Sequence, residues 1–117
     1  MDIEKQEEVR ALCNKNVELA EKYFHLREEA GIANTEFDIL LTAELPAIRQ
    51  ERKGIGYDMA CLVLMEDDEV ARNLYKEWKI KESQYKGLEK LMEAYNSKII
   101  MEMALSKHQI QGEKYGS

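Results

Sequence analysis

The chain has 117 residues, of which 44% are hydrophobic and 34% are charged. This length suits one ordinary domain, and one proline with six glycines excludes a fold of many strands, which needs frequent turns. The longest apolar run, residues 59–65, is too short to span a membrane, and the N-terminus lacks the features of a signal peptide. We therefore expect an acidic, all-α, cytoplasmic protein with a single domain over residues 1–107.

The net charge of −6 is unevenly distributed along the chain. Residues 32–69 carry nine acids and three bases, which gives −6, whereas residues 70–117 carry six acids and nine bases, which gives +3. The acidic middle argues against nonspecific nucleic-acid binding by the whole surface, but the basic last segment leaves a local nucleic-acid site open.

The first predicted helix covers about residues 3–30. Its seam residues recur at alternating spacings of three and four, which is typical of coiled-coil packing: Val9, Leu12, Asn16, Leu19, Tyr23, Leu26 and Ala30. Gly31 follows, and its position predicts the end of the helix. Asn16 either fixes the register of a helix pair or is half exposed on a rotated helix.

A second helix is expected over about residues 36–53, after Asn34 or Thr35 as N-cap. Two structures fit around Pro46: one helix kinked at the proline, or two short helices with Pro46 in the first turn of the second. Gly54 and Gly56 end the segment.

The third helix, about residues 57–66, is apolar almost all round, so periodicity alone does not separate it from a buried strand. Its environment favours a buried helix at the core or at an oligomer interface. The interface residues expected here are Met59, Leu62, Val63 and Met65. The acidic run after it, residues 66–69, is interpreted as a helix cap at Asp67 or Asp68, with a divalent-metal site as the alternative.

The last helix is expected over about residues 69–107, followed by a flexible tail at 108–117. A helix of that length approaches about 60 Å, more than a small core covers, so it must pair with the first helix, with a copy of itself or with another protein. The predicted fold is a helical hairpin or bundle with coiled-coil-like packing. Apolar residues near its end are a further expected interface: Ile99, Ile100, Met103 and Leu105.

A basic stripe runs along the last helix beside its apolar seam. As a nucleic-acid site it would contact phosphates through Arg72, Lys76, Lys79, Lys86 and Lys90. The bases would stack on Tyr75, Trp78 and Tyr85. The alternative is flanking charge in a coiled coil, paired with acids of the first helix that include Glu21 and Glu29.

The chain carries no recognisable catalytic, cofactor or metal motif. Neither histidine has metal-ligand spacing, and Cys13 and Cys61 are expected to be buried free thiols. An all-α magnesium-dependent nucleotide pyrophosphohydrolase is the one enzyme class considered, but no E-x-x-D pair follows the E-x-x-E pairs at suitable distance. We therefore expect no enzyme activity and no cofactor.

Two segments, residues 85–98 and 107–115, resemble small helical proteins carried by bacteriophages and prophages. Such proteins include accessory and host-defence-inhibiting factors, so the resemblance implies binding rather than catalysis. The expected function is that of a self-associating interaction protein, a homodimer or higher oligomer that binds another protein. The alternatives are nucleic-acid binding through the basic stripe and acidic mimicry of nucleic acid by residues 32–69.

Overall fold

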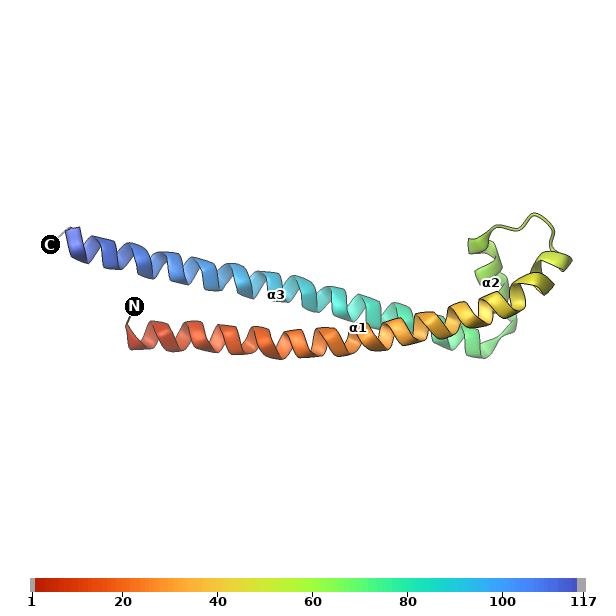
Figure 1. Cartoon of the computed structure of the whole chain (residues 1–117), viewed down its shortest axis with the longest axis horizontal. Coiled ribbons are helices and arrows are strands. Elements are labelled where there is room, and N and C mark those ends of the chain that lie inside the picture. The colour runs from red at the N-terminus through yellow and green to blue at the C-terminus, as the bar shows by residue number, and fades with distance from the viewer. Residues whose placement is uncertain (1, 116–117) are drawn as a thin grey trace. The chain divides into compact units, whose positions relative to one another are not determined.

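A computed structural model describes the backbone of residues 2–115 and the side chains of residues 2–107. It contains three helices, α1 (Ile3–Glu51), α2 (Tyr57–Asp67) and α3 (Glu69–Tyr115), as Figure 1 shows. The predicted all-α hairpin is thereby confirmed. Within the described residues, none of the helices is long and apolar enough to cross a membrane.

The predicted break at Gly31 is wrong, because α1 is one helix of 49 residues. Ala30, Ala33 and Phe37 are 3%, 2% and 1% exposed and continue the seam of the preceding residues. Ending the helix at Gly31 would turn this line away from the core, whereas a glycine inside a helix costs only about 1 kcal/mol. Asn34 and Thr35 are therefore interior helix residues and not caps.

The helix also continues through Pro46, as the one-helix alternative predicted, so the prediction of two short helices is wrong. The kink predicted at the proline stays a prediction. The proline ring removes one backbone hydrogen bond, the one to the carbonyl of Thr42. Leu41 and Ile48, which lie on either side of Pro46 in sequence, are only 2% and 8% exposed. Burial of this apolar face favours the helix despite the missing bond. The helix ends at Glu51, two residues earlier than predicted.

Contacts divide the chain into two compact units, which we call the terminal unit (Met1–Phe24 with Tyr85–Ser117) and the central unit (His25–Gln84). In the terminal unit α1 and α3 run antiparallel: Lys5 forms an ion pair with Glu102, and the ring of Tyr23 meets that of Tyr85 edge to face at 5.7 Å. The ion pair with Glu102 raises the pKa of Lys5 above its usual value.

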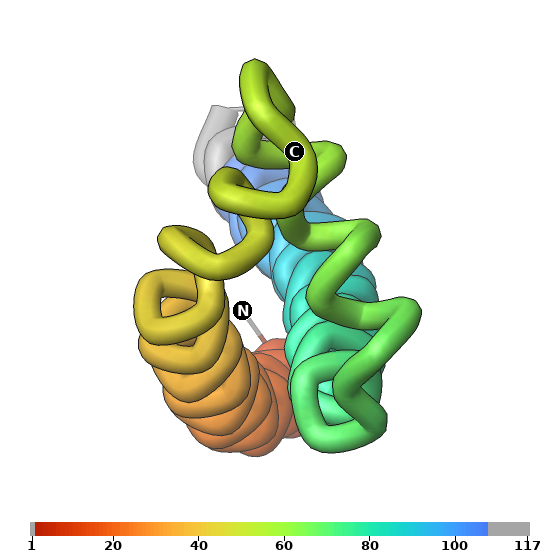
Figure 2. The backbone as a smooth tube through the Cα atoms, turned by 90° about the vertical axis from the view of Figure 1, so that its right-hand side faces the viewer, coloured from red at the N-terminus to blue at the C-terminus, as the bar shows by residue number. Residues whose placement is uncertain are grey.

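The central unit holds its own core where α1, α2 and the start of α3 meet (Figure 2). The buried side chains of this core are Phe37, Leu41, Ile48, Ala60, Val63, Leu64 and Ala71. The Phe37 ring lies 5.6 Å from the Tyr75 ring and 6.5 Å from the Trp78 ring, measured between centroids. Lys81, a charged interruption of the α3 seam, forms an ion pair with Glu29 of α1.

The backbone of α3 is helical to Tyr115, beyond the predicted end at residue 107. The predicted helix end at residue 107 is therefore wrong, whereas the flexibility predicted for residues 108–117 stays a prediction. The last two of these residues lie outside the described part of the chain.

The turn between α1 and α2 depends on Gly54, whose φ of 78° is in the left-handed region. We expect Gly54→Ala to lower the free energy of unfolding by about 1–2 kcal/mol, because an L-residue strains there. Gly56, with φ of −79°, is the matched control. Urea denaturation of both alanine variants checks this, and equal losses would contradict it.

Candidate functional site

Polar contacts join the end of α2 to the start of α3. The Asp68 carboxylate accepts hydrogen bonds from the backbone N–H groups of Val70 (2.9 Å) and Ala71 (3.2 Å), which confirms the predicted cap. Arg72 donates from Nε to the carbonyl of Met65 at 3.0 Å and from Nη2 to that of Glu66 at 3.2 Å. The guanidinium that was predicted to contact phosphate therefore binds the last carbonyls of α2.

The apolar sequence of α2 is divided between a buried face and an exposed face. Ala60, Val63 and Leu64 point into the core, at 0%, 7% and 4% exposure. On the other side of the helix, Met59 and Leu62 are 53% and 52% exposed, and Met65 is half-buried. Tyr57, in the first turn of α2, is 55% exposed. Of the four interface residues predicted on α2, Val63 thus belongs to the core of the central unit.

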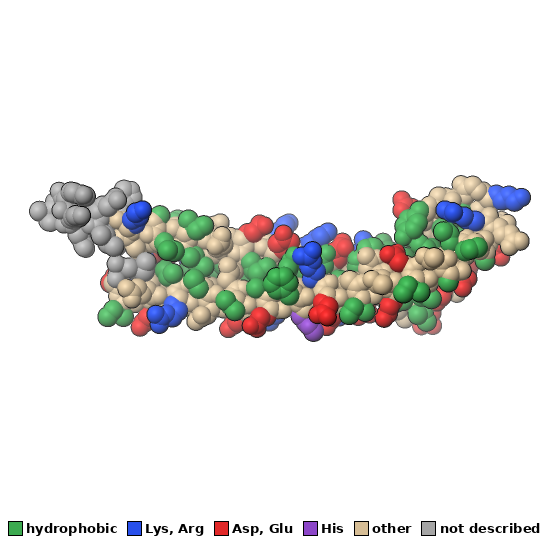
Figure 3. Space-filling model, in the orientation of Figure 1, with side chains coloured by type: hydrophobic (Ala, Val, Ile, Leu, Met, Phe, Trp, Pro, Cys, Tyr) green, Lys and Arg blue, Asp and Glu red, His purple; other side chains and the backbone are tan. Residues whose placement is uncertain are grey.

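Two grooves flank the exposed face of α2. The first, about 430 Å³, is lined by all four predicted interface residues of α2 together with Arg52, Glu66 and Arg72. The second, about 320 Å³, is lined mainly by apolar and aromatic side chains: Phe37, Tyr57, Asp58, Cys61, Leu62, Met65, Tyr75, Trp78 and Lys79. Because Leu62 and Met65 line both grooves, these two side chains form the ridge between them. Figure 3 shows hydrophobic side chains gathered at this end of the central unit.

The rings predicted to stack on bases already have protein partners. Tyr75 and Trp78 are half-buried and meet each other edge to face at 5.7 Å, and the Lys79 ammonium lies 4.1 Å from the Trp78 centroid. Lys79 also pairs with Glu82 of its own helix at 3.8 Å. In the terminal unit, Tyr85 packs on Tyr23.

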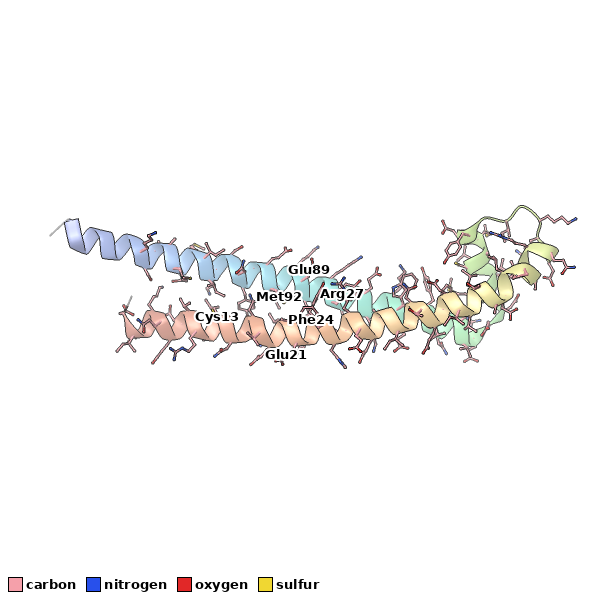
Figure 4. All side chains as sticks on the ribbon, viewed as in Figure 1. Cys13, Glu21, Phe24, Arg27, Glu89 and Met92 are labelled. Carbon is pink, nitrogen blue, oxygen red and sulfur yellow. The ribbon has the colours of Figure 1, made fainter. Side chains whose placement is uncertain are left out.

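The predicted pairing of the stripe with acids of α1 stays a prediction. Glu29 forms an ion pair with Lys81, which is not a stripe residue. Glu21 is exposed and points away from α3, whereas Met92 lies on the side of α3 that faces α1 (Figure 4).

The two cysteines are free, but they are less buried than expected. Cys13 is exposed and Cys61 is half-buried in the second groove. Burial raises the pKa of the Cys61 thiol, so the thiol stays protonated near neutral pH and is a weak nucleophile. The neighbouring Tyr57 hydroxyl donates to the Asp38 carboxylate at 3.3 Å.

A third groove, about 450 Å³, was not foreseen from the sequence. Its floor is apolar, and its acids come from α1 and from the α2–α3 junction: Glu44, Glu51, Asp67, Asp68 and Glu69. The seven-residue spacing of Glu44 and Glu51 is the sequence pattern that indicates part of this groove, because it puts both carboxylates on one side of α1. Among the described residues, no group of three or more His, Cys, Asp or Glu is arranged to hold a metal ion.

The second predicted interface lies near the end of α3 in the terminal unit. Ile100, Met103 and Leu105 are 60%, 52% and 52% exposed, as is Met101 at 57%. Ile99 is half-buried on the seam. Three of the four residues predicted there are thus on the surface of the terminal unit.

Comparisons with known proteins identify no relative: no protein-family model, no curated protein and no solved structure matches the chain.

Proposed function

We propose that this is a non-enzymatic interaction protein that binds another protein through the exposed face of α2. One observation carries the proposal: Met59 and Leu62 are more than half exposed, although the same short helix already supplies three residues to the core. These two side chains line one groove, and exposed apolar side chains that cluster are unfavourable in water unless they have a use. Methionine side chains suit it, because they adapt to partners of different shape.

The grooves beside α2 suggest how a partner binds. An apolar side chain of the partner would enter the groove between Met59 and Leu62, as anchor residues do at protein interfaces. Arg52 and Glu66 on the rim of the same groove would orient polar groups of the partner. The resemblance to phage proteins supports a protein of a bacterial host as this partner.

We expect Leu62→Glu to weaken partner binding at least about tenfold, because a carboxylate would be desolvated in the contact. The matched control is Ile80→Glu, which changes an equally exposed residue (57%) on α3 of the same unit. Tagged wild-type protein would first capture a partner from the source cell, and the purified partner would then be titrated with all three proteins. Circular dichroism verifies that the variants stay helical.

Equal affinities of wild type and Leu62→Glu would overturn the proposal for α2. So would a loss of affinity in Ile80→Glu that matches the loss in Leu62→Glu, because a general effect of surface charge would then explain both.

A second candidate, acidic mimicry of nucleic acid, is favoured by the third groove. Among the side chains that line it in the described part of the chain there are five carboxylates and no base, a pattern that suits a positively charged surface. Competition between DNA and this protein for one partner tests it. Direct nucleic-acid binding stays a prediction. It requires that the protein be retained on DNA or RNA and that this retention fall between about 50 and 200 mM salt. The retention should also be lost in a Lys79→Glu/Lys86→Glu variant.

A further inference from the structure

Over residues 100–106 of α3, two polar side chains face inward and four apolar side chains face outward. Glu102, whose side chain is 19% exposed, faces α1 and pairs with Lys5, and Ser106 is only 3% exposed. Ile100, Met101, Met103 and Leu105 are instead more than half exposed. Figure 3 shows hydrophobic side chains on this part of α3. Pairing with α1 does not account for an outward apolar face, because a two-helix pair buries only its seam.

Two residues of opposite charge lie at equal distances on either side of Ile100 along this face. Glu93, Ile100 and Lys107 are seven residues apart, so they lie nearly on one line along α3, with about 10 Å between neighbours. All three are exposed. Within the described residues, no ion pair involves Glu93 or Lys107. The line therefore has an acid at one end, a base at the other and an apolar residue at its centre.

We propose that this face binds a second copy of the chain, with the two α3 helices antiparallel about a two-fold axis near Ile100. Such an isologous contact brings Glu93 of each copy to Lys107 of the other, so that both charge pairs are attractive. A parallel arrangement would instead place like charges together. Ile100 and Met103 of the two copies would then cover each other.

The contact is independent of the α2 face and adds to the function proposed for it. Residues 93–107 span only about 22 Å of helix, so the buried area is small and the dimer belongs to the weak, reversible class of interfaces. Because its charges are near the surface, association should weaken as salt shortens the Debye length below about 10 Å.

Sedimentation velocity over a wide range of protein concentration tests the proposal with the full chain. Wild type is expected to shift from monomer to dimer, and Ile100→Glu to stay monomeric. Lys107→Glu is expected to raise the dissociation constant roughly tenfold, because two attractive pairs become repulsive. The double variant Glu93→Lys/Lys107→Glu restores opposite charges and is expected to regain most of the wild-type affinity.

Two controls separate this contact from other effects. Lys90→Glu makes the same charge reversal at an exposed α3 residue that lies off the line through Ile100 and Lys107, and it should leave the dimer intact. Leu62→Glu should also dimerise, so failure of the α2 proposal and failure of this one are distinguishable. A wild type that is monomeric at every concentration, an Ile100→Glu variant that still dimerises, or a double variant no better than Lys107→Glu would overturn the inference.

Discussion

Replacing Phe37 by alanine is expected to lower the free energy of unfolding by about 3–5 kcal/mol. The Phe37 side chain is 1% exposed, and its ring packs against those of Tyr75 and Trp78. Its ring joins α1 to α3 in the core, and removal of the ring leaves a cavity there. The central unit loses most from this change, because its core contains few large side chains.

Urea denaturation followed by circular dichroism measures the effect, and fluorescence of Trp78, the only tryptophan, reports on the site itself. Phe24→Ala is the control, since the Phe24 side chain is 63% exposed and its loss should change stability by no more than about 0.5 kcal/mol. Similar losses in the two variants would show that Phe37 does not occupy the core described above.

Substitutions at Gly31 are expected to act in opposite directions. Gly31→Pro should lower the free energy of unfolding by about 3 kcal/mol or more, because proline inside a helix removes a hydrogen bond and clashes with the preceding turn. Gly31→Ala should raise it by about 0.5–1 kcal/mol. A Cβ placed at Gly31 meets no atom within 4 Å, so the gain in helix propensity comes without a steric cost.

The sign of the alanine effect tests whether α1 is continuous. At a left-handed C′ position, where the sequence alone placed Gly31, alanine would be strained and destabilising. Thermal and urea unfolding of both variants give the signs, and helix content by circular dichroism should be unchanged in Gly31→Ala. A destabilised alanine variant would mean that the chain turns at Gly31.

Much of the fold followed from local patterns. The alternating spacing of three and four predicted the seams of α1 and α3, and the acidic run predicted a cap at Asp67 or Asp68, of which Asp68 is the cap. Gly31 locally favours a helix end, so the sequence predicted a break that α1 does not have. Ala33 and Phe37 extend the same spacing beyond Gly31, and seven-residue continuity of this kind favours one helix over a break.

The site was predicted less completely than the fold. Met59 and Leu62 were named from the sequence, but so was Val63, which lies in the core. The acidic groove forms only where Glu44 and Glu51 of α1 lie next to the α2–α3 junction. These segments are far apart in sequence, so their contact depends on how α2 packs.

Helix content and the seams of the two long helices are therefore properties of the sequence, because each depends on residues within a few turns of one another. Which face of α2 is exposed is not, since residues 59–65 are apolar in every direction and offer no contrast for a periodicity to detect. That choice is made where α1 and α3 close on one side of α2, burying Ala60, Val63 and Leu64 and leaving Met59 and Leu62 outside. The surface proposed to bind a partner exists only because of this packing.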